Sequence, residues 1–177
     1  MHKISRAAFL GSVTSVLAGL LPAQEKPRAS PHEKVSAKIG AHEITIEYGR
    51  PYKKGRKIFG GLEPFGKVWR TGADEATTFT TTGDLMVGSL HVPAGAYGLF
   101  TLPTEKGWTL ILNKTAKQWG AFKYDEAMDL GRTPLTMTLA ATPLEQLTIS
   151  IEPAGAGKGT LKIAWDDRVG TAEIMAH

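Results

Sequence analysis

The densest group of chemically capable side chains lies between residues 70 and 77, where Asp74 and Glu75 follow Arg70 by a few positions. An arginine presents a planar fork of N–H donors that matches carboxylates and phosphates, and a carboxylate can act as a general acid or base. This pattern leaves two roles open. Glu75 could exchange protons while Arg70 clamps an anionic or polyhydroxy ligand, or Arg70 and a carboxylate could form a structural ion pair that pins a loop to a sheet.

A second segment, residues 117–124, holds three aromatic residues within six positions: Trp119, Phe122 and Tyr124. Sugar rings stack on exposed aromatic faces, and Trp and Tyr suit such surfaces because one end of each side chain tolerates water. The same rings could instead fill the core. Tyr48 and Arg50 could join this surface or pack beneath it.

Several chemistries are excluded by inspection. The chain has no cysteine, so disulfides, Cys-ligated zinc and a thiol nucleophile are ruled out. His32-Glu33 and His42-Glu43 begin like a zinc-protease helix but lack a second histidine four residues later. The histidines at positions 32, 42, 91 and 177 show no ligand spacing, which leaves only a site assembled in space. We therefore expect neither a metal nor a cofactor.

Residues 1–23 have the features of a cleaved signal peptide. Lys3 and Arg6 precede an apolar run over residues 7–21, and Ala23 offers a small residue for cleavage. The apolar run is too short for a membrane span, which needs about 20 residues. We expect an exported protein, periplasmic or extracellular after cleavage near Ala23, with no stable membrane span after processing.

The charge balance argues against nucleic acid as a partner. Losing Lys3 and Arg6 reduces the formal net charge from +4 to +2. The one dense basic run, residues 53–57, lies in a glycine-rich segment and is typical of a solvated loop. A nucleic-acid-binding domain would show a strongly basic stripe.

The remaining pattern predicts short strands. Apolar and polar residues alternate over residues 35–39, 44–48, 147–152 and 161–166, as in half-buried strands, and residues 108–112 are apolar enough for a central strand. Turn residues at 40–41, 93–95 and 155–159 separate such runs. We count about nine strands and no amphipathic helix, apart from one possible turn within residues 124–130. This pattern predicts an all-β fold. We expect an antiparallel, jelly-roll-like β-sandwich.

We divide the chain into the signal peptide, a flexible leader over residues 24–31, and a single β-sandwich domain over residues 32–177. Residues 49–73 follow neither a strand nor a helix period, yet they carry seven large apolar side chains. Such a segment is too long for an ordinary connection and too apolar for disorder. We expect one long ordered loop laid across an end or edge of the sandwich.

Several segments together resemble the bacterial domain of unknown function 2911 family. They are residues 46–51, 54–62, 68–77, 93–101, 108–114 and 119–124. The resemblance covers about residues 30–165 and implies an exported envelope protein with no assigned reaction. That family more often has Asn at position 74, which moves a catalytic role from Asp74 to Glu75 and Arg70.

We hypothesise a monomeric, non-catalytic β-sandwich that binds a small polar ligand or an envelope component. The candidate ligand-binding residues are Tyr48, Arg50, Lys57, Arg70, Glu75, Trp119 and Tyr124. The alternative is a small metal-independent hydrolase or lyase acting on a polar envelope substrate. In that case Glu75 is the acid/base, Arg70 the anion clamp, and Tyr48 or Tyr124 a second proton carrier.

Overall fold

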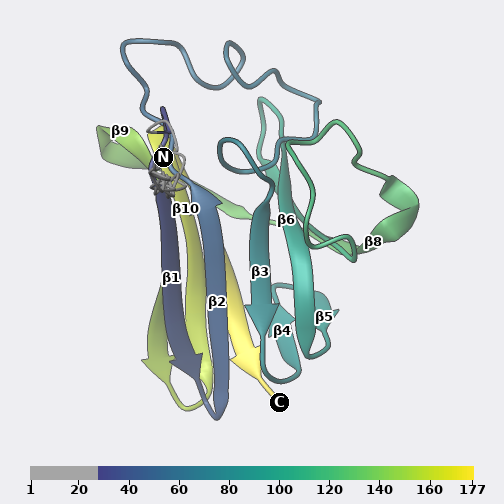
Figure 1. Cartoon of the computed structure of the whole chain (residues 1–177). Coiled ribbons are helices and arrows are strands. Elements are labelled where there is room, and N and C mark those ends of the chain that lie inside the picture. Colours follow the sequence, from purple (N-terminus) through teal and green to yellow (C-terminus); the bar gives the residue numbers. More distant parts are fainter. Residues whose placement is uncertain (1–27) are drawn as a thin grey trace, which may run out of the picture.

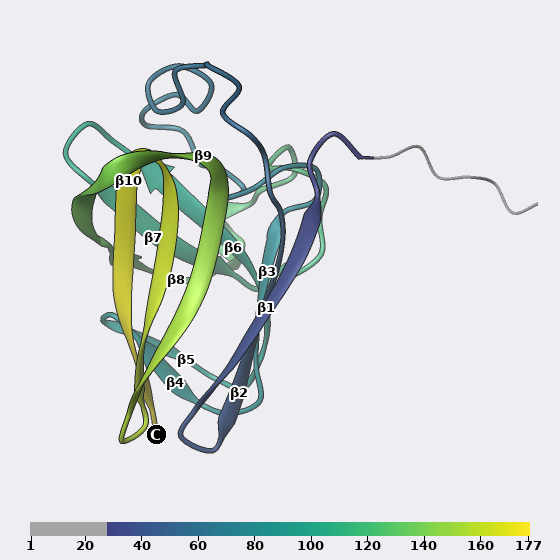
Figure 2. The ribbon, with the colours of Figure 1, turned by 90° about the vertical axis from the view of Figure 1, so that its left-hand side faces the viewer.

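A computed structural model of the protein describes residues 28–177. Two antiparallel sheets pack face to face, and a long loop crosses one end of them (Figures 1 and 2). The predicted all-β sandwich is therefore confirmed. The predicted signal peptide and residues 24–27 of the predicted leader lie outside the described residues. Among residues 28–177, no helix is long and apolar enough to cross a membrane.

The larger sheet has six strands in the order β1-β2-β3-β6-β7-β8, and the smaller has four in the order β5-β4-β10-β9. The strands of the larger sheet are β1 (His32–Ile39), β2 (His42–Gly49), β3 (Thr77–Thr81), β6 (Gly95–Pro103), β7 (Trp108–Asn113) and β8 (Asp129–Pro134). Those of the smaller sheet are β4 (Leu85–Val87), β5 (Leu90–Val92), β9 (Thr136–Gly155) and β10 (Lys158–Ala176). The predicted single helical turn is a 3₁₀ turn, η1 (Glu126–Met128).

Two of the three predicted turns form hairpins. β1 and β2 are joined through Gly40, whose φ of 61° is a left-handed conformation that glycine adopts at little steric cost. β9 and β10 are joined at residues 156–157. The turn at residues 93–94 differs, because it carries the chain from β5 in the smaller sheet to β6 in the larger one. The predicted central strand is β7, which is paired on both sides.

Alternation places one face of each sheet in a shared core. Burying one aliphatic side chain of this size contributes about 1.5–3 kcal/mol to stability. Fully buried members from the two sheets include Ile44, Ile46, Phe79, Leu99, Leu110, Leu161, Ile163 and Trp165. The packing of this core positions β1, β2 and β3. The candidate site lies where β1 and β3 begin and β2 ends.

The segment between β2 and β3 is ordered by aromatic packing. Phe59 and Trp69 from this loop contact Trp108 of β7 and Trp165 of β10, with ring centroids 4.6 Å apart for Phe59–Trp108 and 5.8 Å for Trp69–Trp165. All four rings are buried. Figure 1 shows the loop arching over one end of the sheets, as the sequence predicts.

The two ends of this loop touch each other. The amide of Ala73 donates a hydrogen bond to the carbonyl oxygen of Gly49 over 3.2 Å. A Cβ atom on residue 49 would lie only 2.2 Å from the carbonyl oxygen of Ala73, so the approach requires glycine. Because His32 pairs with Gly49 in the sheet, this contact brings the residues after Ala73 close to the first residue of β1.

Candidate functional site

The site is built around the corner that joins the loop to β3, residues 73–76. Asp74 has a φ of 62°, an uncommon left-handed conformation for a residue with a side chain. A neighbouring segment holds the corner in place, because the amide of Gly120 donates to the carbonyl oxygen of Asp74 and the amide of Ala76 donates to that of Gln118. The side chains of Asp74 and Glu75 therefore lie beside the start of β1.

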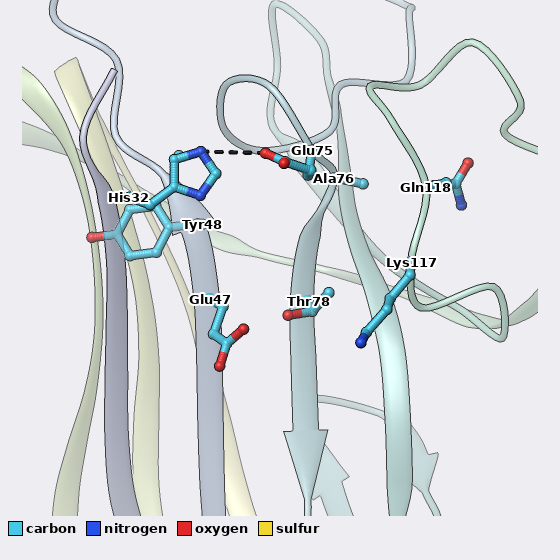
Figure 3. Close-up of a pocket in the computed structure, with 9 residues that line it drawn as sticks. His32, Glu47, Tyr48, Glu75, Ala76, Thr78, Lys117 and Gln118 are labelled. Atoms are coloured by element: carbon cyan, nitrogen blue, oxygen red, sulfur yellow. Dashed lines mark ion pairs between the residues drawn. The ribbon is translucent and has the colours of Figure 1, made fainter. Parts of the chain in front are cut away.

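Three metal-binding side-chain types meet at this corner. Nε2 of His32 lies 3.4 Å from Oδ2 of Asp74 and 3.3 Å from Oε2 of Glu75. One donor atom from each residue lies within 4.8 Å of the other two. Figure 3 shows the imidazole and the Glu75 carboxylate pointing toward one another across the gap between β2 and β3. The sequence pattern predicts no metal, whereas the fold gathers three ligand types here.

Arg28 reaches into the same cluster from the segment before β1. Its Nη1 atom lies 2.8 Å from Nε2 of His32, and 3.0 and 2.7 Å from the two carboxylate oxygens of Glu75. Although partial burial acts to raise the pKa of Glu75, the hydrogen bond from Arg28 and one from the Glu75 backbone outweigh it, so the pKa is lowered. Glu75 is therefore held as a carboxylate, which does not favour a role as a proton donor at neutral pH.

A cavity of about 280 Å³ opens beside this cluster, and His32, Tyr48, Glu75 and Lys117 are among the residues that line it (Figure 3). Tyr48 is almost fully buried, and its hydroxyl accepts a hydrogen bond from the amide of Ile149 over 3.0 Å. Burial raises the pKa of this hydroxyl. Tyr48 thus joins the two sheets through its hydroxyl while its ring borders the cavity.

A second cavity, of about 460 Å³, lies on the other side of the corner, and Arg70 lines it together with Lys54, Arg56, Glu63 and Asp74. None of the salt bridges between described residues involves Arg70. Its Nε atom is buried and has no hydrogen-bond partner within residues 28–177. Arg70 and Glu75 are neighbours in sequence, but they line different cavities.

Glu63 also lines this second cavity, and its pKa departs strongly from the ordinary value. Burial raises its pKa to about 7, even though the nearby charges of Arg70 and Arg56 act to lower it. This carboxyl therefore gains or loses its proton near neutral pH. It supplies a hydrogen-bond donor beside the arginines when neutral, and a negative charge when ionised.

Neither Arg50 nor Lys57 is among the residues that line these two cavities. Arg50 donates from Nε to the carbonyl oxygen of Leu147 and from Nη2 to the hydroxyl of Thr148, and it forms an ion pair with Glu33 at 2.8 Å. These contacts tie β2 to β9 and β1. Lys57 is exposed and borders a separate surface hollow.

The two predicted aromatic ligand contacts have different surroundings. Trp119 is 60% exposed and borders a surface groove with Phe122, which is 87% exposed. Tyr124 instead packs against Phe100, donates its hydroxyl hydrogen to Asp129 and accepts from Arg132. Burial, followed by the Asp129 hydrogen bond, raises the pKa of Tyr124 to about 12. The phenol therefore keeps its proton at neutral pH.

Sequence reasoning missed three residues: Arg28, His32 and Glu63. Arg28 falls in the predicted leader, and His32 lacks any ligand spacing within the chain. Glu63 lies in the loop without a period. The pairing of His32 with Gly49 is the signal that could have found the cluster, because the predicted β1–β2 hairpin already places the start of β1 beside the start of the loop.

Comparison with known proteins adds a family and one partial relative. The family model described as protein of unknown function (DUF2911) matches residues 30–174. A stretch of 62 residues is 36% identical to the transcriptional activator protein anr of Pseudomonas aeruginosa, which is 34% of this chain and 25% of that protein. The chain thus spans about a quarter of that curated relative. No solved structure matches the chain.

Proposed function

The chain belongs to the DUF2911 family of proteins of unknown function, and from this premise we propose that it is an exported protein that binds a small anionic molecule in the cavity beside Arg70. Binding rather than chemistry is favoured because Glu75, the residue expected to act as acid or base in an enzyme, already forms an ion pair with Arg28. Export rests on the predicted signal peptide.

The position and charge of Arg70 carry this proposal. Arg70 lines the cavity, none of the salt bridges between described residues involves it, and its buried Nε has no hydrogen-bond partner within residues 28–177, so its positive charge is not neutralised by a salt bridge there. Guanidinium groups bind carboxylates and phosphates through two parallel hydrogen bonds. Arg70 is thus the expected anchor for the acidic group of the ligand.

The other lining residues define the ligand class. Lys54 and Arg56 add positive charge beside the carboxyl groups of Glu63 and Asp74, and Tyr52 adds an aromatic side chain. A cavity of about 460 Å³ lies within the usual range for small-molecule sites, about 300–1,000 Å³. A carboxylate- or phosphate-bearing molecule with a polar body, such as a sugar acid, fits this combination.

A thermal-shift screen of sugar acids, dicarboxylates and inorganic phosphate tests the proposal. A ligand present at a hundred times its Kd stabilises the folded state by about 2.7 kcal/mol, or roughly 5–10 °C for a domain of this size. Calorimetry on the best compound should then show an affinity loss of about tenfold or more in Arg70→Gln, because a charge-assisted hydrogen bond is lost.

The matched control is Lys67→Gln, which removes an exposed positive charge from the same loop outside the cavity. It should leave the affinity unchanged. Equal affinity in the wild-type and Arg70→Gln proteins would contradict the assignment of Arg70, and a screen in which no anion raises the melting temperature would contradict the proposed function.

A further inference from the structure

We propose that His32, Asp74 and Glu75 form a binding site for one divalent transition-metal ion, and that the guanidinium of Arg28 competes with the ion for this place. The site borders the smaller of the two cavities and is distinct from the anchor at Arg70. It draws on two parts of the chain that are far apart in sequence, the first residue of β1 and the corner before β3.

The distances between donor atoms match a metal centre. For metal–ligand bonds of about 2.1 Å, adjacent ligand atoms of a tetrahedral ion are separated by about 3.4 Å. Nε2 of His32 lies 3.4 Å from Oδ2 of Asp74 and 3.3 Å from Oε2 of Glu75. Two of the three separations are therefore close to the length of a tetrahedral edge, and the third, between the carboxylates of Asp74 and Glu75, is no more than 4.8 Å.

A cationic group already lies in this cluster. Nη1 of Arg28 is 2.8 Å from Nε2 of His32 and 2.7 Å from Oε2 of Glu75, so a positive charge contacts two of the three proposed ligands. A metal ion bound by the same atoms would have to displace the guanidinium, and this is the competition that we propose.

The donor set selects the class of metal. One imidazole nitrogen and two carboxylates suit Zn²⁺, Mn²⁺ or Fe²⁺, whereas Ca²⁺ and Mg²⁺ prefer sites built entirely from oxygen. His32 and Glu75 also line the cavity of about 280 Å³, so an ion held by them borders that cavity. A ligand in the cavity would then lie next to the ion.

Titration calorimetry on the untagged, chelator-treated protein tests this site with ZnCl₂, MnCl₂ and CaCl₂. We expect one Zn²⁺ per chain, weaker Mn²⁺ binding and no Ca²⁺ binding. His32→Ala and Glu75→Gln should each lower the Zn²⁺ affinity more than about tenfold, since even residues that only orient metal ligands have effects of that size. Arg28→Ala should raise the affinity, because it removes the competing cation.

The matched control is His91→Ala, because His91 also lies near a single carboxylate, 3.7 Å from Asp84, on the exposed surface. Its Zn²⁺ affinity should equal that of the wild type. Equal affinity in the wild-type and His32→Ala proteins overturns the metal site. If Arg28→Ala leaves the Zn²⁺ affinity unchanged or lowers it, the proposed competition between Arg28 and the ion is wrong.

A second measurement needs no variant and so does not depend on how the variants fold. Mn²⁺ broadens the NMR signals of nearby nuclei, and in the wild-type protein the amides of residues 32–34 and 72–77 should broaden first. Broadening that begins instead around His91 or His177 overturns the proposal.

Discussion

Glu63 connects stability to pH at the level of a single side chain. In the folded protein burial raises the pKa of Glu63 to about 7, whereas in an unfolded chain this carboxyl has its ordinary pKa of 4.5. The folded state is therefore destabilised as the pH rises from about 4.5 to about 7, and the loss stays constant at higher pH. Arg70 and Arg56 offset part of this penalty.

We predict that Glu63→Gln gains stability relative to the wild type as the pH is raised from 5 to 8. The gain should be on the order of 2 kcal/mol, because each unit of pKa shift corresponds to about 1.4 kcal/mol. Urea unfolding at both pH values measures it. Glu105→Gln removes an exposed carboxyl from the β6–β7 turn and should show no such trend. An equal difference at both pH values would contradict the raised pKa.

Among the elements, the loop between β2 and β3 depends on the close contact of its two ends. At residue 49 the obstacle to a side chain is the backbone carbonyl of Ala73, which no side-chain rotation can remove. A methyl group there must push the corner away from β2. Asp74 and Glu75 would move with the corner, since they follow Ala73 directly.

We predict that Gly49→Ala lowers the free energy of unfolding by about 1–3 kcal/mol, the usual cost of overpacking a well-filled site. Chemical denaturation measures the loss. Gly55→Ala is the control within the same loop, because no atom lies within 4 Å of a Cβ built there. Since Gly55 has a φ of 70°, this control should still cost about 1 kcal/mol through backbone strain. A Gly49→Ala loss no larger than that of Gly55→Ala would contradict the steric argument.

Local chemistry explains which elements could be predicted from sequence. The hairpins β1–β2 and β9–β10 follow from alternating residues around glycine-containing turns, and the burial of Phe59 and Trp69 follows from their apolar character. The order of strands could not be predicted, because a turn such as residues 93–94 has the same local chemistry whether it stays in one sheet or changes sheets.

The candidate site was predictable only in part, for a related reason. Position in the sequence placed Arg70 and Glu75 in one cluster, but the left-handed backbone at Asp74 lies between them, and they line separate cavities. His32 and Arg28 join Glu75 through pairing between β1 and β2 and through a contact 47 residues apart in sequence. Contacts of that range depend on the assembled fold.

At the level of the whole molecule, each sheet edge carries a feature that discourages pairing with another chain. β5 has only three residues, β8 ends in Pro134, and β9 contains Pro143 and Pro153. The remaining edge, β1, presents Lys34 and Lys38 to solvent. Short strands, prolines and lysines are the usual ways in which edge strands avoid aggregation. These features support the expectation of a monomer.

We predict that replacing both lysines, in Lys34→Val/Lys38→Val, produces dimers or larger species at concentrations where the wild type is monomeric. The double change leaves a flatter, more apolar strand with unpaired backbone groups at the sheet edge. Size-exclusion chromatography with light scattering measures the mass. Lys67→Val/Lys106→Val removes two exposed lysines from loops and should remain monomeric. Identical masses for both double variants would show that the β1 lysines have no special role.

The hydrogen bond between Gly49 and Ala73 holds the two ends of the loop together, so the chain leaves the sandwich and returns to it at the same place. The exposed part of the loop can lengthen without shifting the register of β2 or β3, because the entropic cost of a longer loop grows only slowly. This loop contains Arg56, Glu63 and Arg70 of the second cavity. It does not contain His32, Asp74 or Glu75. A change in this loop that spares the packing of Phe59 and Trp69 should therefore leave the corner at residues 74–75 in place, because the Gly49–Ala73 contact holds that corner to the sandwich.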